Sequence, residues 1–208
     1  MTRSIEGPVA TAQMMIRQPI ERVFESLIEP SITSRFWFSK SSGPLSVGKR
    51  VRWDWEMYGL HTEVEVKALE TNKRILLEWN QPEDPSVVEW TFEARGSDLT
   101  FVKVKNWGFA KGDLKRANHE AIASTGGFSF VLAAMNVFLE HGIEPNLIVD
   151  HDPDGLGITL GTVMYLASLN LKEHISKKNG EGKTALMLAS EGGHDETVRV
   201  LTAAGANR

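Results

Sequence analysis

The sequence predicts an α+β fold, in which a curved antiparallel sheet wraps around one long helix and a small all-α extension follows. Three features predict this fold. Apolar and polar residues alternate in segments over about 49–107, an apolar stripe with helical spacing covers about 113–141, and two related segments occur at 162–168 and 184–190. A period of two is typical of half-buried strands, and spacings of three and four are typical of helices. We therefore expect a first domain over residues 1–150 and a helical extension over residues 156–208.

A strand and a short helix are expected first. Residues 9–17 (VATAQMMIR) predict a strand that ends before Pro19. Pro19 marks the start of a helix, because proline is favoured in the first helical turn, and Pro30 ends that helix. The apolar side chains on one face of this helix are Val23, Phe24, Leu27 and Ile28.

Five strands with short turns are expected next. Each has one apolar and one charged face, which is typical of an antiparallel meander with one solvated side. The apolar positions, in chain order, are Val51, Trp53, Trp55 and Met57; Val64, Val66 and Ala68; Ile75, Leu77 and Trp79; Val88, Trp90 and Phe92; and Val102 and Val104. His61, Glu63 and Glu65 fall on the charged face, so we expect them to be solvated.

A long helix over about 113–141 closes the first domain, with Gly142 placed to cap its C-terminal end. Gly126 and Gly127 lie inside it, and each costs about 1 kcal/mol relative to alanine in a helix interior. We therefore expect a kink or a close approach at this pair. The apolar stripe of the helix is Ile122, Phe128, Leu132, Met135 and Leu139. A short helix, a meander and a long closing helix describe the helix-grip arrangement, with a cavity between sheet and helix.

Three motifs carry a resemblance that covers about residues 8–150. They are Pro19-x-x-x-Val23-Phe24 in the first helix, Val47-Gly48 before the third strand, and a glycine pair followed by an aromatic residue in the last helix. Their order resembles the SRPBCC (START-like, helix-grip) superfamily, in the branch named after the activator of heat-shock protein 90 ATPase. That branch often has tryptophan after the glycine, where this sequence has Phe128. The resemblance implies a cavity for an apolar or aromatic small molecule, in a superfamily that includes lipid carriers, cyclases and co-chaperones.

The extension contains two related segments, TVMYLAS at 162–168 and TALMLAS at 184–190. The second, together with His194 and the glycines around it, resembles an ankyrin repeat, although an offset of 22 residues is shorter than the usual period of about 33. The alternative is a helical cap with a similar spacing. Since about three repeats are needed for independent stability, we expect the extension to dock on the first domain, on a protein partner or on a second copy of itself.

The candidate ligand-binding residues line the predicted inner face of the sheet and the facing side of the long helix. Large aromatic side chains would provide contact area for an apolar ligand, and one buried amide would need a polar partner. The alternative is that the aromatic residues only fill the core. The candidates are Trp53, Trp55, Trp79, Trp90, Phe92, Asn106, Phe128 and Leu132.

No catalytic residue, metal or cofactor is assigned. His119 and Glu120, early in the long helix, are weak candidates for an acid–base pair, with a surface position as the alternative. Asp150–Gly155 begins like a calcium loop, but Gly161 stands where a bidentate glutamate is required. Two functions stay open: a binding module for a small hydrophobic ligand and a protein partner, related to stress or chaperone regulation, and a cyclase or hydrolase acting on an aromatic, polyketide-like substrate.

Composition bears on which partners the protein can bind and on its cellular location. The net charge is −4 with scattered basic residues, which argues against nucleic acid and against an anionic membrane surface. There are no cysteines and no continuous apolar segment at the N-terminal end. We expect a cytoplasmic protein, with a homodimer as one use of the extension.

Overall fold

The computed structural model describes residues 7–79, 85–110, 112–151, 182–203 and 206. The chain divides into two compact units, Met1–His151 and Asp152–Arg208.

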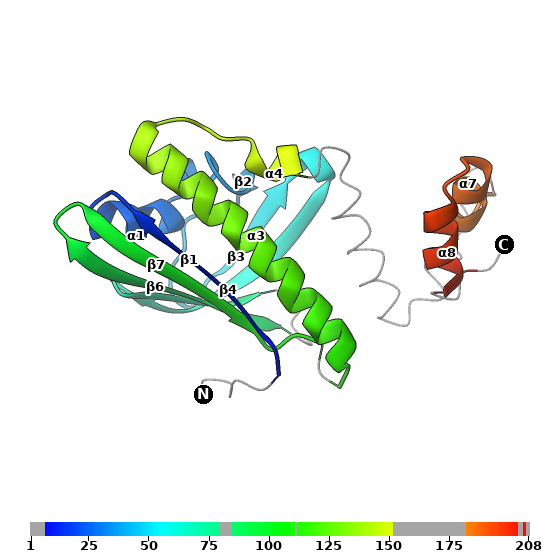
Figure 1. Cartoon of the computed structure of the whole chain (residues 1–208), viewed down its shortest axis with the longest axis horizontal. Helices are drawn as coiled ribbons and strands as arrows, with labels where there is room; N and C mark the ends of the chain where they lie inside the picture. The colour runs from blue at the N-terminus through cyan, green and yellow to red at the C-terminus, as the bar shows by residue number, and fades with distance from the viewer. Residues whose placement is uncertain (1–6, 80–84, 111, 152–181, 204–205, 207–208) are drawn as a thin grey trace. The chain divides into compact units, whose positions relative to one another are not determined.

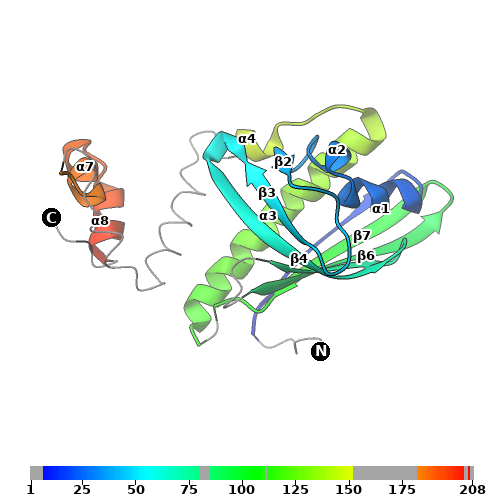
Figure 2. The same ribbon diagram turned by 180° about the vertical axis from the view of Figure 1, so that it is seen from behind.

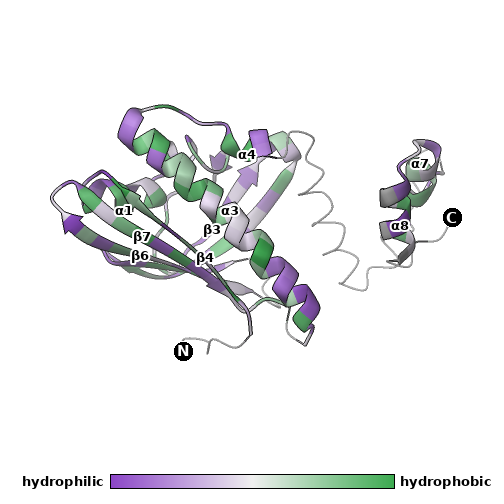
Figure 3. Cartoon of the chain, in the orientation of Figure 1, coloured by the Kyte–Doolittle hydropathy of each residue, from purple (hydrophilic) through white to green (hydrophobic). Residues whose placement is uncertain are grey.

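The first unit is built on one antiparallel sheet, with the strand order β1-β7-β6-β5-β4-β3-β2 (Figure 1). The predicted first strand and the five-stranded meander are confirmed, and the two-residue β2 is an addition. The strands are β1 Val9–Ile16, β2 Lys40–Ser41, β3 Arg50–Trp55, β4 Leu60–Glu70, β5 Arg74–Trp79, β6 Ser86–Gly96 and β7 Leu99–Trp107. Hydrophilic and hydrophobic residues alternate along these strands (Figure 3), because successive side chains point to opposite faces of a sheet.

The strand β3 is shorter than its alternation suggests. It ends at Trp55, and the next three residues form the 3₁₀ helix η1 Glu56–Tyr58. Gly59 follows with φ 62°, a left-handed conformation that favours glycine and allows the chain to turn into β4. The prediction that Met57 continues the inner face is therefore wrong, and its side chain is exposed.

The helices of the first unit are α1 Ile20–Ile28, α2 Pro30–Thr33, α3 Leu114–His141 and α4 Leu147–His151. The long helix α3 lies across the inner face of the sheet (Figures 1 and 2). Gly142 caps its C-terminal end as expected, with φ 69°, and at the other end the Asp113 side chain accepts a hydrogen bond from the Arg116 backbone N–H. Among the described residues, α3 alone is long and apolar enough to span a membrane, and here one side of it packs on the sheet.

One expectation about α3 is wrong, and of the two alternatives for its glycine pair the close approach is not found. Ile122 is 73% exposed, because the buried side of this half of the helix runs through Ala117 and Ala121, and a step of one residue turns about 100° away from it. Among the residues that the structure describes, a Cβ at Gly126 or Gly127 would meet no neighbouring atom within 4 Å, so the pair makes no close approach there. The helix continues through both glycines.

In the second unit the structure describes two helices, α7 Ala185–Glu191 and α8 Asp195–Ala203. The Thr184 side chain caps α7 by accepting a hydrogen bond from the Met187 backbone N–H. Leu186, Ala189 and Leu201 form a small buried cluster between the helices, together with Ala206. The first of the two related segments, at 162–168, and the part of the calcium-loop-like segment beyond His151 lie outside the described residues.

Candidate ligand-binding site

The space between the sheet and α3 contains a group of packed rings, which we call the aromatic cluster. It is defined by ring contacts among Trp37, Phe38, Trp53, Trp79, Trp90 and Phe128. The rings meet in tilted and edge-to-face arrangements, with Phe38 stacked on Trp53 at 4.9 Å between centroids. Such pairs add about 0.5–1.5 kcal/mol each to the stabilisation from burial. Several members come from different strands, so the cluster connects the sheet to α3.

Trp37 lies at the centre of the aromatic cluster, although the sequence analysis did not include it. Its ring centroid is between 5.0 and 6.1 Å from those of the other five members. The residue follows α2 and belongs to neither a helix nor a strand, so no periodicity points to it. The available signal was the run Phe36-Trp37-Phe38, because three consecutive large aromatic residues are unusual in a solvated connection.

The predicted site residues do not all lie together, and of those in the aromatic cluster Trp79 is half-buried. Trp53, Trp90 and Phe128 are buried in the aromatic cluster, next to the fully buried Leu132. Trp55 is half-buried at the end of β3, with its ring 6.3 Å from that of Phe38.

Phe92 lies elsewhere in the core. Its nearest ring is that of Phe24 on α1, at 5.3 Å between centroids. The predicted line of inward aromatic residues is thus divided between the cluster and the packing of α1.

A polar region adjoins the aromatic cluster, at the ends of β6 and β7. Asn106 is 7% exposed and its Nδ2 donates a hydrogen bond to Ser124 Oγ on α3, at 3.0 Å. Its Oδ1 is buried and has no hydrogen-bond partner among the described residues, and the same holds for Ser86 Oγ, whose residue is 5% exposed. We call Ser86, Asn106 and Ser124 the polar end. Trp107 Nε1 is a further buried atom without a partner, but it lies on the opposite parity of β7.

The sheet register explains why these residues share one face. Asn106 lies opposite Val88 on β6, and Ser86 lies opposite Trp79 on β5. Ser86 and Val88 have the same parity, so Ser86 and Asn106 are diagonal neighbours on the inner face. Trp79 belongs to the aromatic cluster, and the polar end is therefore in contact range of it.

Small residues surround the polar end. The facing positions on the first half of α3 are Ala117 and Ala121, while the second half presents Phe128, Leu132 and Met135. Ala10 on β1 lies opposite Asn106 from the other side. The inner surface thus changes from large aromatic to small and polar side chains along one helix.

The two weak catalytic candidates lie away from this space. His119 is exposed, and Glu120 forms an ion pair with Arg116 at 2.7 Å. Ala117 and Ala121 are two residues before and after His119, about 200° around the helix, so His119 points away from the sheet.

Trp37 and Phe38 also line a surface pocket of about 240 Å³ beside the segment that leads into α4. Arg35 and Glu144 form an ion pair at its lining. The Tyr58 hydroxyl donates a hydrogen bond to the Ile148 carbonyl oxygen at 3.0 Å, which ties α4 to η1.

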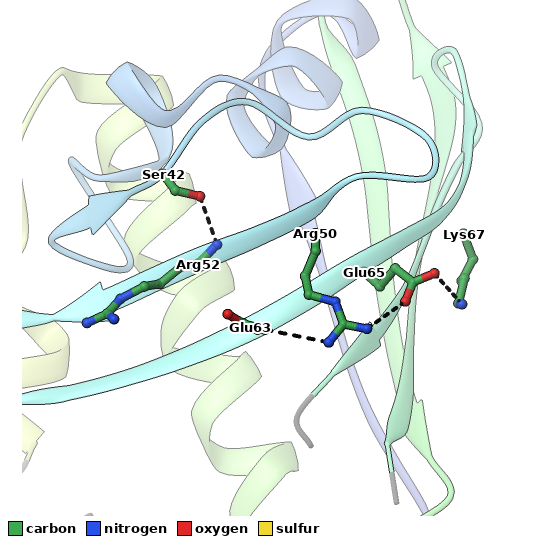
Figure 4. A network of polar contacts seen from close by, with 6 residues as sticks. All are labelled: Ser42, Arg50, Arg52, Glu63, Glu65 and Lys67. Carbon is green, nitrogen blue, oxygen red and sulfur yellow. Dashed lines mark hydrogen bonds and ion pairs between the residues drawn. The ribbon is translucent and has the colours of Figure 1, made fainter. Parts of the chain in front are cut away.

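The outer face of the sheet carries a network of charges (Figure 4). Arg50 on β3 reaches Glu65 at 3.1 Å and Glu63 at 3.6 Å, and Lys67 donates to Glu65 at 2.6 Å. The hydrogen bond from Lys67 lowers the pKa of the Glu65 carboxyl. His61 and Glu63 are exposed and Glu65 is half-exposed, so this face is solvated as expected. No group of three or more potential metal ligands occurs in the described part of the chain.

These observations agree with the comparison with protein families. The family described as Activator of Hsp90 ATPase homolog 1-like protein matches residues 17–140, more than half of the chain. The chain belongs to this family. The resemblance inferred from the sequence motifs is confirmed for the first unit, and residues beyond 140 lie outside the match.

Solved structures share the fold of this family member. The protein SSP2350 from Staphylococcus saprophyticus is 25% identical, with a TM-score of 0.57, over 67% of this chain and 96% of that one. The Aha1 dimer from Colwellia psychrerythraea is 17% identical, with a TM-score of 0.56, over 65% and 98%. The di-domain ARO/CYC BexL from the BE-7585A biosynthetic pathway is 16% identical, with a TM-score of 0.58, over 66% of this chain and 48% of that one. A comparison with curated proteins finds no match.

Proposed function

We propose that the first unit is a non-enzymatic binding module for a small apolar or aromatic ligand, held between the sheet and α3. The observation that carries this proposal is the change in side-chain size along the inner surface, from the aromatic cluster to the small residues around the polar end. Aromatic walls with a few placed polar groups are the usual composition of ligand pockets. The ligand-binding residues of the proposal are those predicted from the sequence, with Trp37 added and without Phe92, whose ring packs on Phe24 of α1.

Burial and charge support a neutral, mainly apolar ligand. In the described part of the chain, the buried residues are apolar or uncharged polar ones, and none is charged. Rings such as those of Trp79 and Phe128 offer large contact areas at little entropic cost.

A protein partner is the second part of the proposal. The α7–α8 helix pair, as one ankyrin-like repeat, would bind it, since such repeats present protein-recognition surfaces. The family name supports a chaperone-related regulator as one version, and the dimeric Aha1 relative supports a homodimer as another. A cytoplasmic location is part of this proposal. The mass in solution of the full chain, compared with that of a chain ending at Asp150, tests the dimer: equal oligomeric states would exclude the extension as its cause.

Ligand binding is tested by filling the small-residue region. Ala121→Phe would place a ring beside the polar end, and the matched control Ala123→Phe changes an exposed position two residues away on the same helix. We expect native mass spectrometry to detect a small molecule carried by the wild-type chain and by the control, and not by Ala121→Phe.

Thermal unfolding of the same variants shows whether the small-residue region around Ala121 is free to hold a ligand or is packed core. If the region is free to hold a ligand, Ala121→Phe fills it with little loss of stability. If the region is packed core, the ring overpacks it, and the variant loses about 1–3 kcal/mol. That loss, with no bound molecule in the wild type, would refute the proposal.

A further inference from the structure

We propose that the polar end selects ligands that carry a neutral hydroxyl group, which donates a hydrogen bond to Asn106 and accepts one from Ser86. This inference rests on the proposed function and names the chemical class of its ligand: an aromatic ring system with a hydroxyl at one end, such as a phenol or naphthol. Two buried polar atoms, Asn106 Oδ1 and Ser86 Oγ, have no hydrogen-bond partner in the part of the chain that the structure describes.

Unpaired buried polar atoms are rare because they give up hydrogen bonds to water without replacement. Asn106 Oδ1 and Ser86 Oγ are both in this state, on residues that are more than nine-tenths buried. The Asn106 amide is fixed by its bond to Ser124 Oγ. Either assignment of its oxygen and nitrogen leaves one polar atom of this amide facing no partner among the described residues.

The two groups offer complementary chemistry on one face. The Asn106 oxygen is an acceptor, and the Ser86 hydroxyl can donate. They lie diagonally across β6 and β7, a spacing of roughly 7 Å or less between Cβ atoms in an antiparallel pair. A single hydroxyl between them can therefore satisfy both groups, whereas a purely apolar ligand would leave both unsatisfied.

A neutral head group follows from the surroundings. A carboxylate or an ammonium group needs an opposite charge when it is removed from water. None of the buried residues that the structure describes carries a charge. The polar end therefore disfavours ionised ligands and suits an uncharged hydroxyl.

The orientation of the ligand is set by α3. Ser124 and Phe128 are four residues apart, so they lie on the same side of the helix, one turn from each other. Phe128 contacts Trp79 and Trp90 at ring-centroid distances of 6.0 and 5.5 Å. A ligand with its hydroxyl at the polar end therefore directs its ring system towards the aromatic cluster.

The test compares two probes of equal shape, 2-naphthol and 2-methylnaphthalene, by calorimetric titration of the full chain. They differ in whether a hydroxyl or a methyl group meets the polar end. We expect 2-naphthol to bind about tenfold more tightly, the effect of one net hydrogen bond. Asn106→Leu and Ser86→Ala should each reduce this ratio to about twofold or less, mainly by weakening 2-naphthol.

Thr100→Val is the matched control. Thr100 is a buried polar residue on the same strand, but its hydroxyl already donates to the Gln18 carbonyl oxygen at 2.8 Å, at the far end of β7. The control should retain the wild-type ratio. Should Asn106→Leu fail to fold, the ratio measured with Ser86→Ala decides the question, because this change removes one atom.

The outcomes distinguish selection of a hydroxyl from ligand binding as such. Equal binding of both probes to the wild type would overturn the selection of a hydroxyl and leave the proposed function standing. An unchanged ratio in Ser86→Ala and Asn106→Leu would also overturn it, since the preference would then arise elsewhere. Binding of neither probe would count against the proposed function and, with it, against this inference.

Discussion

Replacement of Trp37 by alanine should destabilise the first unit strongly. The side chain is 7% exposed and meets five other rings, so the substitution removes about 200 Å² of buried aromatic surface. At about 25 cal/mol per Å² this corresponds to about 5 kcal/mol, an upper value because unfolded chains are partly compact. Measured losses for Phe→Ala and Trp→Ala in protein cores are about 3–5 kcal/mol, and we expect a value in this range.

Urea unfolding of the full chain, followed by circular dichroism, measures this loss. Trp55→Ala is the matched control, because Trp55 is half-buried at the end of β3 and meets the cluster through Phe38. Its loss should be less than half of that at Trp37. Added indole should bind the space vacated at position 37 and restore part of the stability of Trp37→Ala, with no effect on Trp55→Ala. A loss below about 1 kcal/mol at Trp37 would refute its central role in the packing.

Three further substitutions test the unpaired hydroxyl of Ser86, the pair of Glu65 with Lys67, and the role of His119. Ser86→Ala should leave the free energy of unfolding unchanged or raise it, since it removes an unpaired hydroxyl. Thr100→Val should lower the free energy of unfolding by about 1 kcal/mol, because it removes a paired hydroxyl. Equal losses for the two variants in urea unfolding would contradict the assignment of the unpaired atom. Glu65→Gln should slightly lower stability at pH 7, because a carboxyl with a lowered pKa stabilises the fold above its unfolded pKa. This difference should shrink as the pH falls below that unfolded pKa and through the lower pKa of the folded state, and a pH-independent difference would speak against the pair with Lys67. His119→Ala should leave the affinity for 2-naphthol unchanged in calorimetry, and loss of a turnover activity in this variant would instead favour the cyclase or hydrolase alternative.

The sequence predicted those elements whose burial repeats with a regular period. The meander strands and α3 each bury one face over many residues, so the positions of Val64, Trp90 and Leu132 followed from spacing. The C-terminal cap of α3 was readable for a similar reason, because Gly142 satisfies a local requirement of a helix end. These features depend on neighbours that are close in sequence.

The errors fall where distant segments decide the outcome. Trp37 lies in a connection without periodicity, and only the fold brings it among rings from three strands and α3. Ile122 is an error of a different kind: it lies six residues before Phe128, about 240° around the helix, so the regular spacing of the stripe leads to Ala121 and Ala117 instead. Ser86 is the second half of the polar end, and the sequence analysis found only Asn106, because a serine at the start of a strand carries no signal of its own.

The glycine pair in α3 separates two mechanically different halves of one helix. Neither glycine has a neighbour that would exclude a methyl group, so alanine at both positions would gain roughly 2 kcal/mol of helix stability without a steric cost. The backbone hydrogen bonds around Gly126 and Gly127 should therefore open more readily than those near Leu132, and hydrogen exchange should be fastest at this midpoint of the helix interior. We therefore expect the half of α3 beside the polar end to move relative to the sheet more easily than the half that packs on the aromatic cluster.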